Sequence, residues 1–455
     1  MLIASLLKNS EAILFKFIAV IFYFMKTEDL YRIFTEESTG ISTDSRTLKK
    51  GQLFFALWGQ NFNGNKYAAE AIIKGASYAV IDDPAFETDR TILVDDTLLE
   101  LMGLATHHRK MTNAKVLAIT GTNGKTTTKE LIAAIMSKKY KVHFTKGNLN
   151  NEIGLPMTIL SAPGDVEMMV LEMGANHPGE IRTLCNIARP DYGIITNIGN
   201  AHIEGFGSFE GVLKAKSELY EYLNKVNGVA IYNDKNPLLA EKVFRLINRG
   251  VPYSNPAGVD LVIEALPSEM NLAIRVKFQH KTHEIQTALF GSYNLENVTA
   301  AVATGLFLGV SMEDILGEVA KYQPGNNRSQ IKTTPENEIV CDSYNANPTS
   351  MALAIKAFSE HKAGKKAVIL GDMLELGEKS EEEHLKLVDQ IKLLNAEKVF
   401  LVGSNFKKAS EGTGFLSFSD VNELRDYLRK EPLKGKFILV KGSRGITLEK
   451  VYDLL

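Results

Sequence analysis

The residues best suited to chemistry lie in a glycine-rich run, Gly121–Thr127, with the sequence GTNGKTT. Backbone N–H groups at the start of a helix attract anions, and glycines let the backbone approach phosphate oxygens closely. In such a loop Lys125 would neutralise charge on the β- and γ-phosphates, and the Thr126 hydroxyl would bind Mg²⁺. Ile119 occupies the position of the first glycine in the common GxxxxGK[ST] loop, so this form is more compact. We expect a nucleotide-phosphate loop; the alternative is an ordinary turn from strand to helix.

Two polar residues at the ends of later strands are candidate ligands for a metal ion. Glu172 ends the apolar run Met168–Glu172, and open α/β sheets bind ligands at the carboxyl ends of their strands. Its carboxylate oxygens suit a hard cation such as Mg²⁺, although a glutamate at a strand end can also be a solvated edge residue. His202 follows the run Tyr192–Thr196 in the same way. It is either a ligand at the same site or a histidine that only forms structural hydrogen bonds.

Lys216 lies on the apolar face of a predicted helix, Phe209–Leu223. A lysine on a buried face is costly unless it is neutral or paired. Burial would lower its pKa and leave a nucleophilic free amine, which could add CO₂ and become a carbamate, an anionic metal ligand. The alternative is a side chain that extends along its apolar stem to solvent. The apolar residues that define this face are Val212, Ala215, Leu219, Tyr220 and Leu223.

Three further polar clusters follow later in the chain: Gly291–Asn297, Cys341–Pro348 and Lys441–Arg444. The amide side chains of the first cluster could contact a purine edge. The other two each follow a predicted strand, and Asn347 with Pro348 marks a turn. No Ser-His-Asp or Cys-His set has the spacing of a known motif, so covalent nucleophilic catalysis has no support in the sequence.

These residues are positioned by strands that alternate with helices, a pattern typical of parallel sheets covered on both faces. Three such blocks, 25–112, 113–325 and 326–455, predict an α/β protein of three domains. Ser380 with Glu383 predicts a capping box at the start of a helix in the third block. The predicted strands are Gln52–Leu57, Tyr78–Ile81, Thr91–Val94, Lys115–Thr120, Met168–Glu172, Tyr192–Thr196, Val229–Tyr232, Glu338–Asp342, Ala367–Leu370, Val399–Val402 and Phe437–Val440.

Length and composition agree with this division. The 455 residues fit about three domains at roughly 150 residues each. Hydrophobic residues make up 45% and charged residues 23%, which excludes long-range disorder. The net charge of −2 gives no electrostatic reason to expect binding to nucleic acid, which needs a basic excess. The two cysteines, Cys185 and Cys341, are far apart in the sequence, which fits a reducing compartment and argues against a disulfide framework.

Residues 1–24 include an apolar run, 12–24, that is interrupted only by Lys16. Thirteen residues are too few to span a membrane, which takes about 20, and no small-x-small cleavage site follows. Three interpretations compete: a peripheral anchor or signal, a packed terminal helix, or translated upstream sequence before a true start at Met25. We favour the last, so residues 1–24 are expected to be an extension outside the fold, with no stable membrane insertion.

Taken together, the motifs resemble the ATP-dependent Mur ligases of peptidoglycan synthesis. The resemblance rests on GTNGKTT, on Glu172 in EMGANH, on His202 in NAHIEGFGS and on Lys216 in GVLKAKSE. Within that family, three runs (145–158, 172–181 and, above all, DSYNANPTSM at 342–351) are similar to the member that adds D-alanyl-D-alanine to a UDP-N-acetylmuramoyl-tripeptide. The match runs from about Thr43 to Gly445.

The resemblance implies an N-terminal domain that holds the UDP-sugar, a central ATPase domain and a C-terminal Rossmann-like domain. It also implies an ADP-forming amide ligase of cytoplasmic precursor synthesis, acting as a monomer. The tripeptide carboxylate would take the γ-phosphate of ATP, and the dipeptide amine would then displace phosphate from the acyl-phosphate. Cell-wall biogenesis, cell shape and cell division would depend on the product.

The resemblance also implies roles for individual residues. Thr126 and Glu172 would hold one Mg²⁺, and Glu172, His202 and carbamylated Lys216 a second. Where the family commonly has His before the adenine-contacting Asn297 motif, this chain has Tyr293. The remaining implied contacts are ATP at Gly121, Thr122, Asn123, Gly124, Lys125, Thr126 and Thr127, adenine at Asn297, phosphate and ribose at Arg328 and Asp342, uridine diphosphate at Ser45 and Arg46, acyl-phosphate at Asn150 and Asn151, and dipeptide at Asn345 and Asn347.

Two other functions compete with this interpretation. A nucleotide-dependent switch or binding module would use the same loop, but would need neither a second metal site nor an inward-facing Lys216. A sibling ligase would add a single amino acid to a nucleotide-peptide or to folate, and the run DSYNANP argues against it. The third residue of the acceptor peptide, meso-diaminopimelate or lysine, is left open by the sequence.

Overall fold

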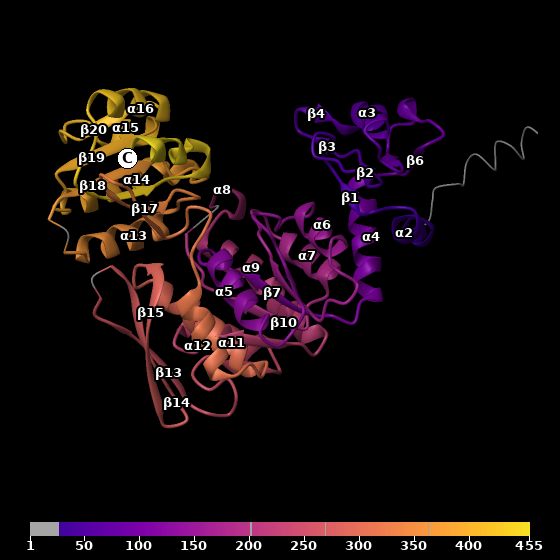
Figure 1. Cartoon of the computed structure of the whole chain (residues 1–455), viewed down its shortest axis with the longest axis horizontal. Helices are drawn as coiled ribbons and strands as arrows, with labels where there is room; N and C mark the ends of the chain where they lie inside the picture. Colours follow the sequence, from indigo (N-terminus) through magenta and orange to yellow (C-terminus); the bar gives the residue numbers. More distant parts are fainter. Residues whose placement is uncertain (1–26, 201–202, 269, 363) are drawn as a thin grey trace, which may run out of the picture. The chain divides into compact units, whose positions relative to one another are not determined.

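Figure 1 shows a computed structural model of the chain, which describes residues 27–200, 203–268, 270–362 and 364–455. The expectations for residues 1–24 and for His202 lie outside these ranges. The chain forms two compact units. The first comprises residues up to Asn113 together with Glu152–Gly164, and the second comprises Ala114–Asn151 and Asp165–Leu455.

The first unit is a small α/β layer, as its sequence predicts. Its four parallel strands lie in the order β1-β2-β5-β6, and a short hairpin, β3–β4, follows β2. Helix α6 packs on α4 although it comes from a later part of the chain, an insertion that the sequence did not reveal. The elements are α2 (Thr27–Glu36), β1 (Ile41–Ser42), β2 (Leu53–Phe55), β3 (Trp58–Gly59), β4 (Phe62–Asn63), α3 (Ala68–Ile73), β5 (Ala79–Ile81), β6 (Thr91–Leu93), α4 (Thr97–Met111) and α6 (Gly154–Leu160).

The second unit begins with a six-stranded parallel sheet in the order β12-β11-β10-β7-β9-β8. Alternate residues of a strand face opposite sides of a sheet. Leu117 and Ile119 of β7 pack with helices α5 and α11, whereas a Cβ on Gly193 of β10 would meet Leu219 of α9. The strands are β7 (Lys115–Thr120), β8 (Val142–Phe144), β9 (Met168–Glu172), β10 (Tyr192–Ile195), β11 (Val229–Tyr232) and β12 (Gly250–Pro252). The helices are α5 (Lys125–Met136), α7 (Glu180–Ala188), α8 (Ile203–Phe206), α9 (Phe209–Lys225), α10 (Pro237–Leu246), α11 (Asn294–Phe307) and α12 (Met312–Lys321).

A three-stranded antiparallel sheet follows, which is absent from the strands predicted from the sequence. Its strands β13 (Leu261–Leu266), β14 (Asn271–Phe278) and β15 (Lys281–Phe290) pair in sequence order. Buried residues of β13 and β14 join the same hydrophobic core as α5 and α11. The sheet therefore extends the core of the parallel sheet.

The last sheet has the order β16-β17-β21-β18-β19-β20, parallel except for β16. Leu439 of β21 packs with α13 and α14, while its neighbours Ile438 and Val440 pack with α16, so both faces are covered. The predicted capping box is wrong: Ser380 is the first residue of α14, and no side-chain cap precedes it. The elements are β16 (Gln330–Thr333), β17 (Glu338–Asp342), α13 (Pro348–Glu360), β18 (Lys366–Gly371), α14 (Ser380–Lys392), β19 (Lys398–Val402), α15 (Ser404–Ala409), β20 (Leu416–Phe418), α16 (Val421–Lys430) and β21 (Phe437–Lys441).

The α/β fold class with parallel sheets is thus confirmed. Cys185 and Cys341 are both buried free thiols. Among the described residues, the helices are too short or too polar to cross a membrane.

Candidate active site

The run Gly121–Thr127 forms the turn between β7 and α5, with backbone conformations that need glycine. Gly121 has φ 139° and Gly124 has φ 77°, a range in which side chains are strained. A Cβ on Gly121 would overlap Thr196, and one on Gly124 would overlap the Asn297 amide. The loop is therefore packed too closely for larger residues, and its amides at the start of α5 can face an anion.

The Lys125 side chain folds back over this loop. Its Nζ donates to the carbonyl oxygens of Gly121 (2.7 Å) and Thr122 (3.1 Å). Burial lowers the pKa of Lys125, and the nearby Glu172 carboxylate opposes that shift. The cation thus lies at the loop, where a phosphate group would need one.

Glu172 is held beside the loop because β9 pairs with β7, with Glu172 opposite Ile119. Its side chain is 2% exposed. One carboxylate oxygen accepts from Thr126 Oγ1 (2.8 Å) and the other from Asn150 Nδ2 (2.9 Å). The structure therefore brings together three residues that the sequence predicted as metal and acyl-phosphate contacts, and their oxygen atoms are of the kind that Mg²⁺ prefers.

Lys129 is a further residue near this carboxylate, and sequence reasoning missed it. It is fully buried, and its Nζ lies 3.9 Å from Glu172 Oε2 and 3.6 Å from Glu130 Oε1, with no hydrogen-bond partner. The available signal was its position four residues, or about one helical turn, after Lys125. Burial lowers the pKa of Lys129, and the Glu172 and Glu130 carboxylates oppose that shift.

Lys216 is buried on the inner face of α9, as predicted. It is 2% exposed, and its Nζ donates to the Ala175 carbonyl oxygen (3.1 Å) and lies 5.2 Å from the centre of the Phe206 ring. Burial, together with the nearby Lys125 cation, lowers the pKa of Lys216 to about 7. A large share of this amine is therefore uncharged near neutral pH, the form that can react with CO₂. Within the described ranges, which omit His202, no group of three or more His, Cys, Asp or Glu residues could hold a metal ion.

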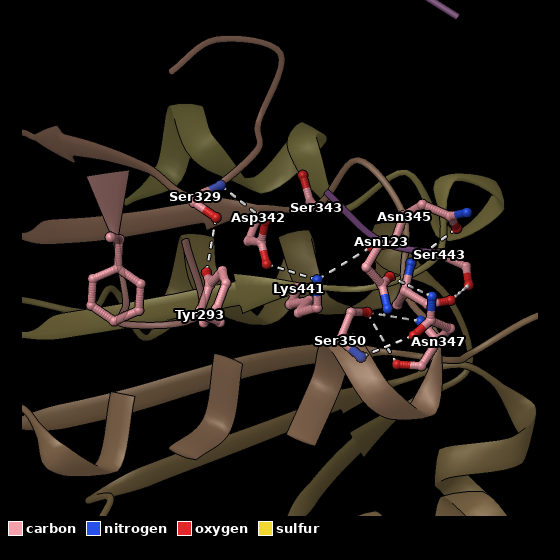
Figure 2. A network of polar contacts seen from close by, with 12 residues as sticks. Asn123, Tyr293, Ser329, Asp342, Ser343, Asn345, Asn347, Ser350, Lys441 and Ser443 are labelled. Atoms are coloured by element: carbon pink, nitrogen blue, oxygen red, sulfur yellow. Dashed lines mark hydrogen bonds and ion pairs between the residues drawn. The ribbon is translucent and has the colours of Figure 1, made fainter. Parts of the chain in front are cut away.

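A second polar cluster lies at the ends of β17 and β21 (Figure 2). Asp342, predicted to contact phosphate or ribose, accepts from the Ser329 backbone N–H (2.9 Å) and from Lys441 Nζ (2.7 Å). Lys441 is 3% exposed and also donates to the Asn345 carbonyl oxygen (3.3 Å). The sequence singled out the run that contains Lys441, but not its role as the partner of Asp342.

The run 342–351 meets the phosphate loop directly. Asn347 caps α13, because its side-chain oxygen accepts from Ser350 N, and its Nδ2 donates to Asn123 Oδ1 (2.8 Å). Asn345 is exposed, and its side-chain oxygen accepts from the Ala346 backbone N–H. Residues predicted for the dipeptide and for ATP are therefore neighbours.

Arg328 and Asn297 already have protein contacts. The Arg328 guanidinium lies 3.6 Å from the centre of the Tyr344 ring, and its buried Nε has no hydrogen-bond partner. Asn297 is 7% exposed, and its amide bonds to Thr128 Oγ1 (3.2 Å) and to Asn294 Oδ1 (2.8 Å). Their roles at phosphate and adenine stay predictions.

The remaining residues predicted to bind ATP lie in the loop Gly121–Thr127. They are Thr122, whose Oγ1 forms hydrogen bonds with Gly199, and Thr127, which is 7% exposed.

The residues predicted for uridine diphosphate lie in the first unit. Ser45 is buried, and its hydroxyl donates to Glu70 (3.4 Å). Arg46 is exposed and pairs with Asp44 at 2.7 Å, and its hydrogen bonds lower the pKa of Asp44 to about 2. Asn151, predicted beside Asn150, is exposed in the second unit.

Comparison with models of known protein families shows the family to which the chain belongs. Three family models match the chain: "Mur ligase family, catalytic domain" at residues 37–140, "Mur ligase middle domain" at 119–305 and "Mur ligase, glutamate ligase domain" at 327–444. The chain therefore belongs to the Mur ligase family.

Individual relatives narrow the class further. The chain is 36% identical to the UDP-N-acetylmuramoyl-tripeptide–D-alanyl-D-alanine ligase of Bacillus subtilis, over 90% of this chain and 92% of that protein. It resembles a crystal structure of MurF from Acinetobacter baumannii with a TM-score of 0.80 at 32% identity, covering 91% of this chain and 92% of the other. MurF from Thermotoga maritima in complex with ADP also gives a TM-score of 0.80, at 28% identity, covering 91% and 96%.

Proposed function

We propose that this chain is an ATP-dependent, ADP-forming amide ligase that joins D-alanyl-D-alanine to UDP-N-acetylmuramoyl-tripeptide. The observation that carries the proposal is the hydrogen bond between Asn347 and Asn123. It connects the run 342–351, which the resemblance associates with the dipeptide, to a loop built for phosphate. The proposal is also supported by relatives of that name, which match nine-tenths of the chain.

The reaction has two steps. A carboxylate oxygen of the tripeptide attacks the γ-phosphorus of ATP, and the bond to the leaving ADP oxygen breaks. The dipeptide amine then attacks the activated carbonyl carbon, loses a proton, and expels phosphate from the tetrahedral intermediate. The protein mainly orients the reacting groups and offsets negative charge.

The chain's own residues supply these effects. The Lys125 ammonium and the loop amides would hold the phosphates, while Asn150 would orient the group that receives phosphate. Asn297 would contact adenine, with Arg328 and Asp342 near phosphate and ribose. Ser45 and Arg46 would bind the uridine diphosphate, Asn151 would assist Asn150, and Asn345 and Asn347 would face the dipeptide.

Two magnesium ions and a lysine carbamate are part of the proposal. Thr126 and Glu172 would hold one ion, and Glu172, His202 and carbamylated Lys216 the other. The fit is supported by the buried oxygen atoms around Glu172 and by the buried amine of Lys216, whose pKa is lowered to about 7. Bound Mg²⁺ would offset charge on the phosphate oxygens.

The wider setting follows from the same proposal. The blocks 25–112, 113–325 and 326–455 would bind the UDP-sugar, ATP and the dipeptide. The enzyme would act as a cytoplasmic monomer in peptidoglycan precursor synthesis, with small-molecule substrates, no nucleic-acid partner and no stable membrane insertion.

The test is a substrate-omission assay on the full chain with ATP, Mg²⁺, D-alanyl-D-alanine and the UDP-linked tripeptide in its meso-diaminopimelate and lysine forms. ADP and amide should form in equal amounts, and only when all substrates are present. ATP hydrolysis without either acceptor would instead indicate a nucleotide switch. Equal use of a single amino acid in place of the dipeptide would indicate a sibling ligase.

A further inference from the structure

A short segment between α12 and β16 has an unusual backbone. Asn326, Asn327 and Ser329 have φ values of 55°, 54° and 49°. Asparagine adopts this left-handed conformation more readily than other non-glycine residues, whereas serine rarely adopts it unless its surroundings hold it. The contacts of this segment therefore show what it is held against.

Tyr293, at the start of α11, holds the segment from one side. Its hydroxyl and the Ser329 hydroxyl form a 2.8 Å hydrogen bond, and Ser329 is 5% exposed. The Ser329 backbone N–H donates to Asp342 Oδ1 (2.9 Å) on the other side (Figure 2). Ser329 is thus fixed through both its side chain and its backbone.

The same segment is paired with the residues that follow Asp342. The Tyr344 backbone N–H donates to the Asn327 carbonyl oxygen (3.3 Å), and the Arg328 guanidinium stacks on the Tyr344 ring. From Asp342 the contacts continue to Lys441 (2.7 Å) and from Lys441 to the Asn345 carbonyl oxygen (3.3 Å). The position of the loop 342–347 therefore depends on the segment that Tyr293 holds.

We propose that Tyr293 is a positioning residue for the loop 342–347 and hence for the second substrate, a dipeptide with a free amine. This inference rests on the proposed function, because the dipeptide role of the loop comes from it. It assigns Tyr293 to the amine substrate, although the residue precedes Asn297 in the run associated with adenine. The tyrosine hydroxyl is essential to this role because it is the group that reaches Ser329.

The test compares Tyr293→Phe and Ser329→Ala with the full-length wild type. Each variant removes the same hydrogen bond, and Ser329→Ala keeps the backbone N–H that Asp342 accepts. We expect the KM for D-alanyl-D-alanine to rise about threefold to tenfold, the change that corresponds to one ordinary hydrogen bond. The calorimetric Kd for ADP should change less than the KM, because both variants keep the Ser329 backbone N–H that donates to Asp342. The double variant should be no worse than either single variant.

A readout without catalysis accompanies these assays. Hydrogen–deuterium exchange of peptides that cover residues 342–347 should be faster in Tyr293→Phe than in the wild type. The matched control is Tyr140→Phe, which removes a hydrogen bond of similar length (2.9 Å, to the Leu308 carbonyl oxygen) from another half-buried tyrosine of the same unit. It should leave both the KM and the exchange at 342–347 unchanged.

The outcomes separate the two proposals. If the wild type forms no amide, the proposed function fails, and exchange still tests whether Tyr293 holds the loop. If the wild type is active but Tyr293→Phe leaves the dipeptide KM or the exchange unchanged, the inference about Tyr293 is wrong. It is also wrong if the Kd for ADP changes as much as the KM, because Tyr293 would then act at the nucleotide.

Discussion

The side-chain amide of Asn347 donates a 2.8 Å hydrogen bond to the side-chain oxygen of Asn123, joining the cap of α13 to the phosphate loop. The Asn123 backbone is fixed independently, since its N–H donates to Asn197 and its carbonyl oxygen accepts from Thr196. The backbone of Asn123 is therefore held in place while its side chain contacts Asn347. A change in either asparagine should affect how the two substrates are aligned.

Asn347→Asp separates the cap from this contact. Aspartate still accepts from Ser350 N and caps the helix well, but it cannot donate to Asn123. We expect a stability within about 0.5 kcal/mol of the wild type and a kcat/KM lowered about tenfold or more. Asn347→Ala should lose the cap as well, about 1 kcal/mol. Urea unfolding and steady-state kinetics measure both; wild-type kinetics for Asn347→Asp would show that the contact is unimportant.

Gly124→Ala should disrupt the phosphate loop. A methyl group there would overlap the Asn297 amide at φ 77°, so both strain and collision apply. The control is Gly258→Ala, which has φ 74° and open space around its Cβ, so it pays only the conformational cost of about 1 kcal/mol. ADP affinity measured by calorimetry should fall strongly for Gly124→Ala and stay unchanged for Gly258→Ala. Equal affinities would contradict the packing described for the loop.

Burial of Lys216 predicts a pH-dependent stability difference. Its folded pKa, about 7, lies below the ordinary value of 10.5, so the unfolded chain binds more protons between these values. The loss of folding stability caused by burying Lys216 is therefore full below pH 7 and becomes smaller as the pH rises towards 10.5. Lys216→Met should gain stability over the wild type most at pH 6.5, and the gain should shrink by pH 9. Urea unfolding at several pH values measures this difference in stability. A gain independent of pH would contradict a buried Lys216 with a lowered pKa.

The proposed carbamate predicts a chemical rescue. Lys216→Ala should be at least about a hundredfold less active, because an anionic metal ligand would be lost. Small carboxylic acids such as formate should restore part of the activity by occupying the vacated space. Lys214→Ala, which changes an exposed lysine two residues away on the same helix, should be active and insensitive to these acids. If Lys216→Ala is fully active without additives, the carbamate has no part in the mechanism.

The local patterns of the sequence predicted much of the site. GTNGKTT follows a continuous apolar strand, so the loop and its strand could be predicted without long-range information. The same holds for Glu172 at a strand end. Lys216 could be predicted to face inward because helical periodicity fixes its side of α9, and the structure confirms its burial.

What the sequence did not reveal depends on contacts between distant residues. The pairing of Asp342 with Lys441 follows from strand order, since β21 lies beside β17 although it is the last described strand along the chain. The strands β13–β15 were missed because parts of them, β15 above all, have exposed faces. The spacing of Ser380 and Glu383 predicts a capping box that does not form, whereas Asn347 and Ser350 form one at the start of α13.

The central claim is that a carboxylate is activated by phosphate transfer before the amine attacks. The most direct measurement uses UDP-linked tripeptide labelled with ¹⁸O in its terminal carboxylate, with mass spectrometry of both products. We expect a pentapeptide product whose new amide carbonyl retains one labelled oxygen. The inorganic phosphate should carry the other labelled oxygen. Unlabelled phosphate formed together with the amide would contradict it.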